Sequence, residues 1–123
     1  MTTDILGESI LETIRNMLGP SADYEHFDPE IVPHINSAFN RLKQLKVGTD
    51  EGFIITGPDE TWSDFFGDNP VIQMVVSYVF FKVKMSFDPP SSSIASESYK
   101  NLISEYEWCM NVDAESESLG GSD

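Results

Sequence analysis

The side chains of this sequence that could do chemistry are two histidines, one cysteine and many carboxylates. His26 lies in Glu25-His26-Phe27-Asp28, where a histidine beside acids could serve a hydrolase or bind a metal ion. A metal site needs several ligands that converge on one point, but the only other histidine is His34 and no Cys–His spacing exists. We therefore expect no metal site, and we assign Asp28 to the N-cap of a helix.

The remaining candidates for chemistry are equally weak. Cys109 could act as a nucleophile only if a histidine reached it, so we expect a buried structural cysteine. Acid pairs such as Glu105 and Glu107 are expected to be solvated surface groups in a chain this acidic. The glycines form neither G-x-G-x-x-G nor G-x-x-x-x-G-K-[ST], which excludes the common phosphate loops. The sequence predicts no catalytic residue and no cofactor, and we expect a protein that is not an enzyme.

The charge of the chain restricts its partners. The formal net charge is −14 over 123 residues, with only seven lysines and arginines. Such a chain repels nucleic acid and anionic membrane surfaces over most of its area, and it favours protein partners with basic patches. The longest apolar stretch, 71–83, is interrupted by Gln73, Ser77 and Lys82, so no membrane span is expected.

Hydrophobic spacing predicts four helices, at about 4–18, 29–46, 70–87 and 94–112. The third is ambiguous, because Phe81, Val83, Met85 and Phe87 alternate with polar residues as in a strand. Its length of about 18 residues without a turn signal favours a helix. It is also apolar nearly all round, which predicts burial on several sides and more apolar surface than a small bundle needs.

The stretch 48–68 is expected to be irregular, with a short strand at Phe53-Ile54-Ile55 and a helical turn capped by Thr61. From Asp113 the composition changes to serine, glycine and acids without a base. We expect a mainly all-α fold: a four-helix bundle-like domain at 1–112 and a flexible acidic tail at 113–123.

The aromatic residues of the helical turn, Trp62, Phe65 and Phe66, allow two interpretations. They could close the core beneath the irregular stretch, or they could anchor a neighbouring subunit, since aromatics are favoured as interface hot spots. We take these three, together with Arg41 and Lys43, as the candidate subunit interface.

From residue 5 to about 112 the chain resembles the small head–tail connector (adaptor) proteins of tailed bacteriophages. The stretches that carry the resemblance are His26-Phe27-Asp28, Ile35-Asn36-Ser37, Leu42-Lys43-Gln44-Leu45, Val47-Gly48, Thr61-Trp62-Ser63-Asp64-Phe65, Lys82-Val83-Lys84, Phe87-Asp88-Pro89-Pro90, Glu107-Trp108 and Asn111-Val112. The chain departs from the expected pattern at Lys46 and Thr49, where a glycine and a turn residue are expected.

The resemblance implies a helical protein that is not an enzyme and that binds the portal protein after DNA packaging. Its copies would form a ring, twelve-fold in the family, that offers a platform to a tail-side stopper or tail-completion protein. It implies a protein assembled in the bacterial cytoplasm and located in the virion at the head–tail interface. DNA would pass through the ring without specific binding, and a negatively charged wall would repel it.

The resemblance also suggests roles for segments. The end of the chain, 107–123, is implied to be a portal-docking arm, with Glu107, Trp108, Met110 and Val112 as its candidate contacts. The stretch 48–68 is implied to be available to a ring neighbour or to the tail-side component.

Two other functions stay open at this point. One is a small acidic regulatory protein that binds a basic protein by mimicking the charge of DNA, and its binding should collapse in moderate salt. The other is a hydrolase that uses His26 and nearby acids.

Overall fold

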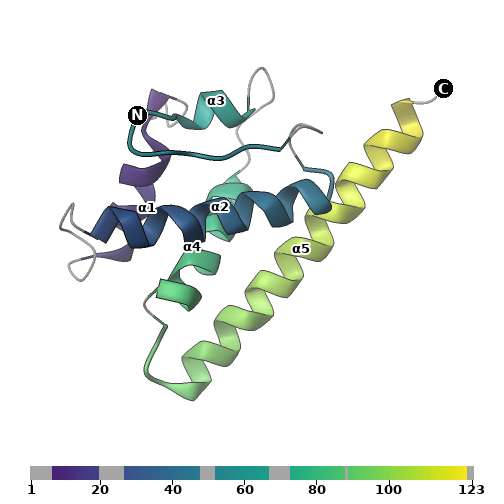
Figure 1. The fold of residues 1–123 in the computed structure, drawn as a ribbon. Helices are drawn as coiled ribbons and strands as arrows, with labels where there is room; N and C mark the ends of the chain where they lie inside the picture. The colour runs from purple at the N-terminus through teal and green to yellow at the C-terminus, as the bar shows by residue number, and fades with distance from the viewer. Residues whose placement is uncertain (1–6, 20–26, 48–51, 67–72, 88, 122–123) are drawn as a thin grey trace, which may run out of the picture.

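The fold is mainly helical, as predicted. The computed structural model describes residues 7–19, 27–47, 52–66, 73–87 and 89–121, with side chains up to Asn111. These ranges hold five helices (Figure 1): α1 (Ile10–Leu18), α2 (Asp28–Gln44), α3 (Trp62–Phe66), α4 (Gln73–Phe87) and α5 (Ser93–Gly121). Within them no strand is formed, and one isolated antiparallel bridge joins Ser9 to Thr61.

Helix α4 lies at the centre of the packing. It contacts α1, α2 and α5, which explains why its sequence is apolar on several sides. Val75, Val79 and Val83 recur at helical spacing and are fully buried. The strand-like alternation of residues 81–87 therefore does not specify a strand, because a helix with three neighbours buries side chains on most of its circumference.

The starts of α1 and α3 are joined to each other. The Ile10 N–H donates to the Glu60 carbonyl at 3.0 Å, and the Trp62 N–H donates to the Glu8 carbonyl at 3.2 Å. Each helix thus satisfies its first free N–H with a carbonyl that precedes the other helix. Thr61 caps α3 as predicted, since its hydroxyl accepts from the Asp64 N–H while the Asp64 carboxylate accepts from the Thr61 N–H at 2.8 Å.

The predicted strand at Phe53-Ile54-Ile55 is wrong, and Asn36 on α2 explains why the segment is still ordered. The Asn36 side-chain oxygen accepts from the Ile55 N–H at 2.7 Å, and its amide nitrogen donates to the Ile55 carbonyl at 3.0 Å. One side chain thereby supplies both backbone bonds that a neighbouring strand would have supplied. Ile55, 1% exposed, is buried against the core without a sheet.

Several predicted helix ends are corrected. Ser9 caps α1, and α1 begins at Ile10 rather than near residue 4; residues 1–6 lie outside the described ranges, as do 70–72 before α4. Asp28 is not an N-cap, since the position is taken by Phe27 without a side-chain bond. The Asp28 carboxylate instead accepts two hydrogen bonds from Arg15 on α1, at 3.1 and 3.2 Å. Pro29 lies in the first turn of α2, as predicted.

The end of α2 forms without the expected glycine. Lys46 adopts a left-handed backbone with φ of 69°, and the Val47 N–H donates to the Leu42 carbonyl at 2.9 Å. The Lys46 N–H donates to the Lys43 carbonyl at 3.0 Å, which completes the pair of bonds of a Schellman motif. A lysine here accepts the conformation that glycine adopts more easily.

Helix α5 is longer than predicted. It continues past Val112 to Gly121, because residues 113–119 contain neither glycine nor proline. In Figure 1 its last turns extend past the end of α2 with no other element drawn beside them. The division of the chain at residue 112 and the flexibility of 113–123 stay predictions.

We expect Asn36→Ala to destabilise the protein by about 2 kcal/mol, because it leaves the buried N–H and carbonyl of Ile55 without partners. Asn40→Ala is the matched control, since Asn40 is exposed on the same helix. It should change stability by less than about 0.5 kcal/mol. Urea unfolding followed by circular dichroism measures both, and equal stability of the two variants would contradict the role given to Asn36.

Candidate functional site

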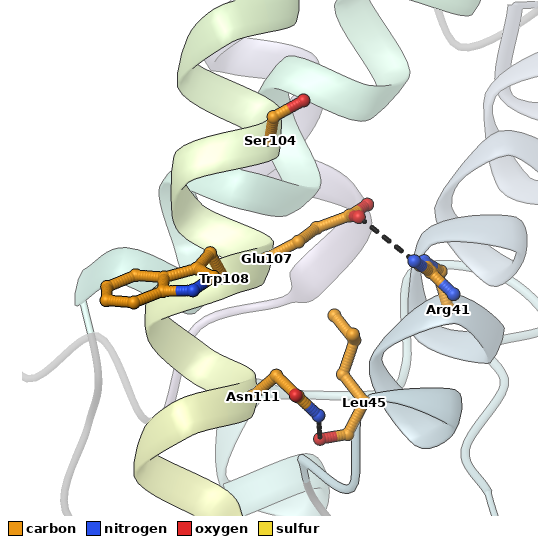
Figure 2. A pocket seen from close by; sticks show the side chains of 6 residues that line it. All are labelled: Arg41, Leu45, Ser104, Glu107, Trp108 and Asn111. Atoms are coloured by element: carbon orange, nitrogen blue, oxygen red, sulfur yellow. Dashed lines mark hydrogen bonds and ion pairs between the residues drawn. The ribbon is translucent and has the colours of Figure 1, made fainter.

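Three helices meet at the carboxylate of Glu107 on α5. One carboxylate oxygen accepts from the Tyr78 hydroxyl on α4 at 2.6 Å, and the other accepts from the Arg41 guanidinium on α2 at 3.2 Å. Figure 2 shows the Glu107 side chain reaching from α5 toward Arg41. We call these residues the Glu107 triad. Glu107 is therefore not the solvated surface acid that the sequence suggested.

The contacts of the triad favour an ionised Glu107, a protonated Tyr78 and a charged Arg41. Burial would raise the pKa of Glu107, but hydrogen bonds from Tyr78 and Arg41 outweigh it and lower that pKa. Burial, and then the bond to Glu107, raise the pKa of Tyr78. The hydrogen bond to Glu107 raises the pKa of Arg41. Around neutral pH the triad is thus an ionised Glu107 carboxylate that accepts hydrogen bonds from a neutral tyrosine hydroxyl and a charged guanidinium.

A shallow pocket of about 250 Å³ lies beside the triad, between α2 and α5 (Figure 2). Its lining residues are Arg41, Leu45, Ser104, Glu107, Trp108 and Asn111. The Asn111 side chain donates to the Leu45 carbonyl at 3.4 Å, which ties the end of α2 to α5. In Figure 2 the Trp108 ring points away from Arg41, on the other side of the α5 ribbon.

The described residues offer no arrangement typical of catalysis. Glu107 is engaged by two donors, and Cys109 is a half-buried free thiol rather than the fully buried one expected. His34 is half-buried, while His26 lies outside the described ranges. In the described part of the chain no three His, Cys, Asp or Glu residues converge as metal ligands would. Nor does any helix there have the length and apolarity to cross a membrane.

The aromatic residues proposed for a subunit interface lie in the core of the chain itself. Trp62 is fully buried, while Phe65 and Phe66 are 5% and 4% exposed. The Trp62 indole N–H donates to the Thr13 hydroxyl at 3.1 Å, which fixes the ring against α1. Of the two interpretations, the structure agrees with the one in which these rings close the core beneath the irregular stretch.

The apolar surplus expected of α4 is also small. Its side chains are buried or half-buried within the single chain, except Gln73 and Ser86. The large apolar side chains that the described residues leave exposed lie on other elements: Met17, Ile54, Ile94 and Trp108. The prediction that α4 carries more apolar surface than a small bundle needs is therefore wrong.

The remaining interface candidates differ in exposure. Arg41 is partly exposed and engaged by Glu107, whereas Lys43 is exposed.

The candidate docking arm divides into inward and outward residues. Glu107 faces the triad and Met110, 5% exposed, belongs to the core, whereas Trp108 is 67% exposed. The side chain of Val112 lies outside the described part. Sequence reasoning missed Tyr78, although a tyrosine on an otherwise apolar helix signals a buried hydroxyl that needs a polar partner.

We expect Glu107→Gln to lower stability at pH 7 by about 1–2 kcal/mol, because neutral hydrogen bonds replace charged ones. Folding lowers the pKa of Glu107, so the ionised carboxylate stabilises the folded protein. This contribution is complete at a pH above the ordinary pKa of 4.5, and it is lost as the pH falls through the lowered pKa of the folded protein. The difference between wild type and variant should therefore shrink in acid. Urea unfolding of both proteins measures this difference between about pH 3 and 7, the range in which carboxylates titrate.

The exposed Glu105, two residues away on α5, gives the matched control. Glu105→Gln should change stability little at any of these pH values. A loss at Glu105 as large as that at Glu107 would contradict a specific role for the triad.

Comparison with known proteins gives a family. The model of the phage connector protein family matches residues 10–117, which include all five helices up to the last turn of α5. No curated protein and no solved structure matches the chain. The match covers most of the chain, and the fold that it covers is the helical one described above, so this protein belongs to the phage connector protein family.

Proposed function

We propose that this protein is a structural head–tail connector that binds the portal after DNA packaging and forms a ring to which the next connector or the tail attaches. The match to the phage connector family over residues 10–117 carries the proposal. The family is structural rather than enzymatic, which supports that role. The virion would be its place of function.

The shape of α5 supports a docking role for the end of the chain. The Glu107 triad and the Asn111 bond hold the middle of α5 against α2 and α4. Beyond that anchor the helix continues past the rest of the fold (Figure 1). A helix fixed at its middle and projecting at its end can enter a partner without unfolding the domain, which limits the entropy lost on binding.

The charge supports a location around DNA. A net charge of −14 gives any ring of these chains a negative surface, which repels the phosphate backbone. DNA could then move through the ring without being retained.

The proposal is tested by mixing the purified protein with DNA-filled capsids that carry portals and imaging the particles by electron microscopy. We expect added density in a ring on the portal and co-sedimentation of the protein with the particles. Capsids without portals are the control and should bind none. The absence of binding to portal-bearing particles would remove the proposal.

The same sample separates the connector from an acidic regulatory protein, which the charge of −14 favours. A contact that rests on charge alone should be lost when salt is raised toward 1 M, where the screening length is about 3 Å. A connector contact with apolar anchors should survive that change. Loss of all binding at moderate salt would favour the regulator.

A further inference from the structure

The most exposed aromatic side chain of the described residues stands on the outer surface of α5. Trp108 is 67% exposed, although indole rings bury large apolar areas when they can. The triad fixes the rotation of α5, since Glu107 faces Arg41 and Tyr78, and Trp108 lies about 100° further around the helix. Figure 2 shows the ring pointing out from α5 while Glu107 points inward.

The sequence around and after Trp108 is rich in acids. Lys100 is the last basic residue of the chain, and the acids that follow it are Glu105, Glu107, Asp113, Glu115, Glu117 and Asp123. Glu107 is neutralised by Arg41, but Glu105 is exposed and takes part in neither ion pair found among the described residues. Glu105 precedes Trp108 by three positions, so the two side chains are neighbours on one surface of the helix.

An exposed indole with a carboxylate one turn away fits one chemical group particularly well. A guanidinium is planar, stacks on the face of an indole, and can give two parallel hydrogen bonds to a carboxylate. A lysine ammonium could make the charge contact, but it lacks the planar stacking surface. A hydrophobic side chain would cover the ring and leave Glu105 without a partner.

On the basis of the function proposed above, we propose that Trp108 and Glu105 form a recognition site for an arginine of the portal protein. The guanidinium stacks on the indole and pairs with the Glu105 carboxylate. Arg41 does not oppose this contact, because the Glu107 carboxylate neutralises its charge. Between residues 113 and 117 the sequence carries three further acids, and this negative charge favours a basic partner surface.

Binding to portal-bearing, DNA-filled capsids tests the site through a series at one position. Trp108→Ala should weaken binding at least about tenfold, as loss of an aromatic hot spot does. Trp108→Phe should keep more affinity than Trp108→Leu, because phenylalanine retains a ring face and leucine only an apolar surface. Affinity of the Leu variant equal to that of wild type would overturn the stacking contact.

Glu105→Gln should weaken the same binding by about three- to tenfold, and the variant should lose less affinity than wild type when salt is raised. Ile94→Ala is the matched control, since Ile94 is an exposed apolar residue, 79% exposed, near the start of the same helix. It should bind as wild type does. If Glu105→Gln binds as tightly as wild type, or Ile94→Ala loses as much as Trp108→Ala, the proposed site is refuted.

A second measurement uses the free protein, so it tests the Trp108 site independently of binding to capsids. Trp62 is fully buried, so quenching of tryptophan fluorescence by small ions reports Trp108. Relative to N-acetyl-tryptophanamide, caesium should quench the protein more effectively than iodide at low ionic strength, and Glu105→Gln should reduce the difference. Stronger relative quenching by iodide would overturn the site. Failure of wild-type protein to bind the capsids would instead refute the proposed function.

Discussion

The hydrogen bonds that one half-buried carboxylate on α5 makes to α2 and α4 determine which surface of α5 faces solvent. Helix α5 has a weakly amphipathic sequence, and hydrophobic burial alone would set its rotation and height against α4 only loosely. The hydrogen bonds of Glu107 to Tyr78 and Arg41 are directional, so they select one rotation and one register. Trp108 lies about 100° further around the helix than Glu107 and two positions before the buried Met110, so it is turned away from the core. The exposure of Trp108 thus follows from the rotation of α5 that these hydrogen bonds and the burial of Met110 fix together.

The sequence predicted the helices well where local signals and tertiary packing agree. The cap at Thr61, the proline in the first turn of α2 and the helical state of α4 follow from short-range chemistry. Helix ends were less predictable, because several neighbouring residues can end a helix with similar free energies. Lys46 illustrates this, since a left-handed lysine closes α2 before the glycine at position 48 is reached.

The errors arose where a side chain far away in the sequence replaces a local partner. Asp28 has the type and position of an N-cap, but Arg15 on α1 takes both of its oxygens. Phe53-Ile54-Ile55 has the composition of a strand, but Asn36 satisfies Ile55 without one. Neither pairing leaves a periodic signal in the sequence. The triad is of the same kind, because Arg41, Tyr78 and Glu107 are each ordinary in their own helix and become a site only when α2, α4 and α5 meet.

The strongly negative charge divides into groups with different physical roles. Asp28 and Glu107 each face an arginine, and Glu60 accepts bonds from Thr56 and Gly57. Burial would raise the pKa of Glu60, but the Thr56 bonds outweigh it and lower that pKa, so this acid stabilises a turn. The acids from 113 to 117 differ, because Asp113 and Glu117 are four positions apart in a helix, where like charges repel each other. A basic partner surface would relieve that repulsion as it binds. Part of the binding free energy of the projecting helix would then come from charges that are unfavourable in the free protein. The acids that face Arg15, Arg41 and Thr56 would keep their contacts, so the fold would not change on binding.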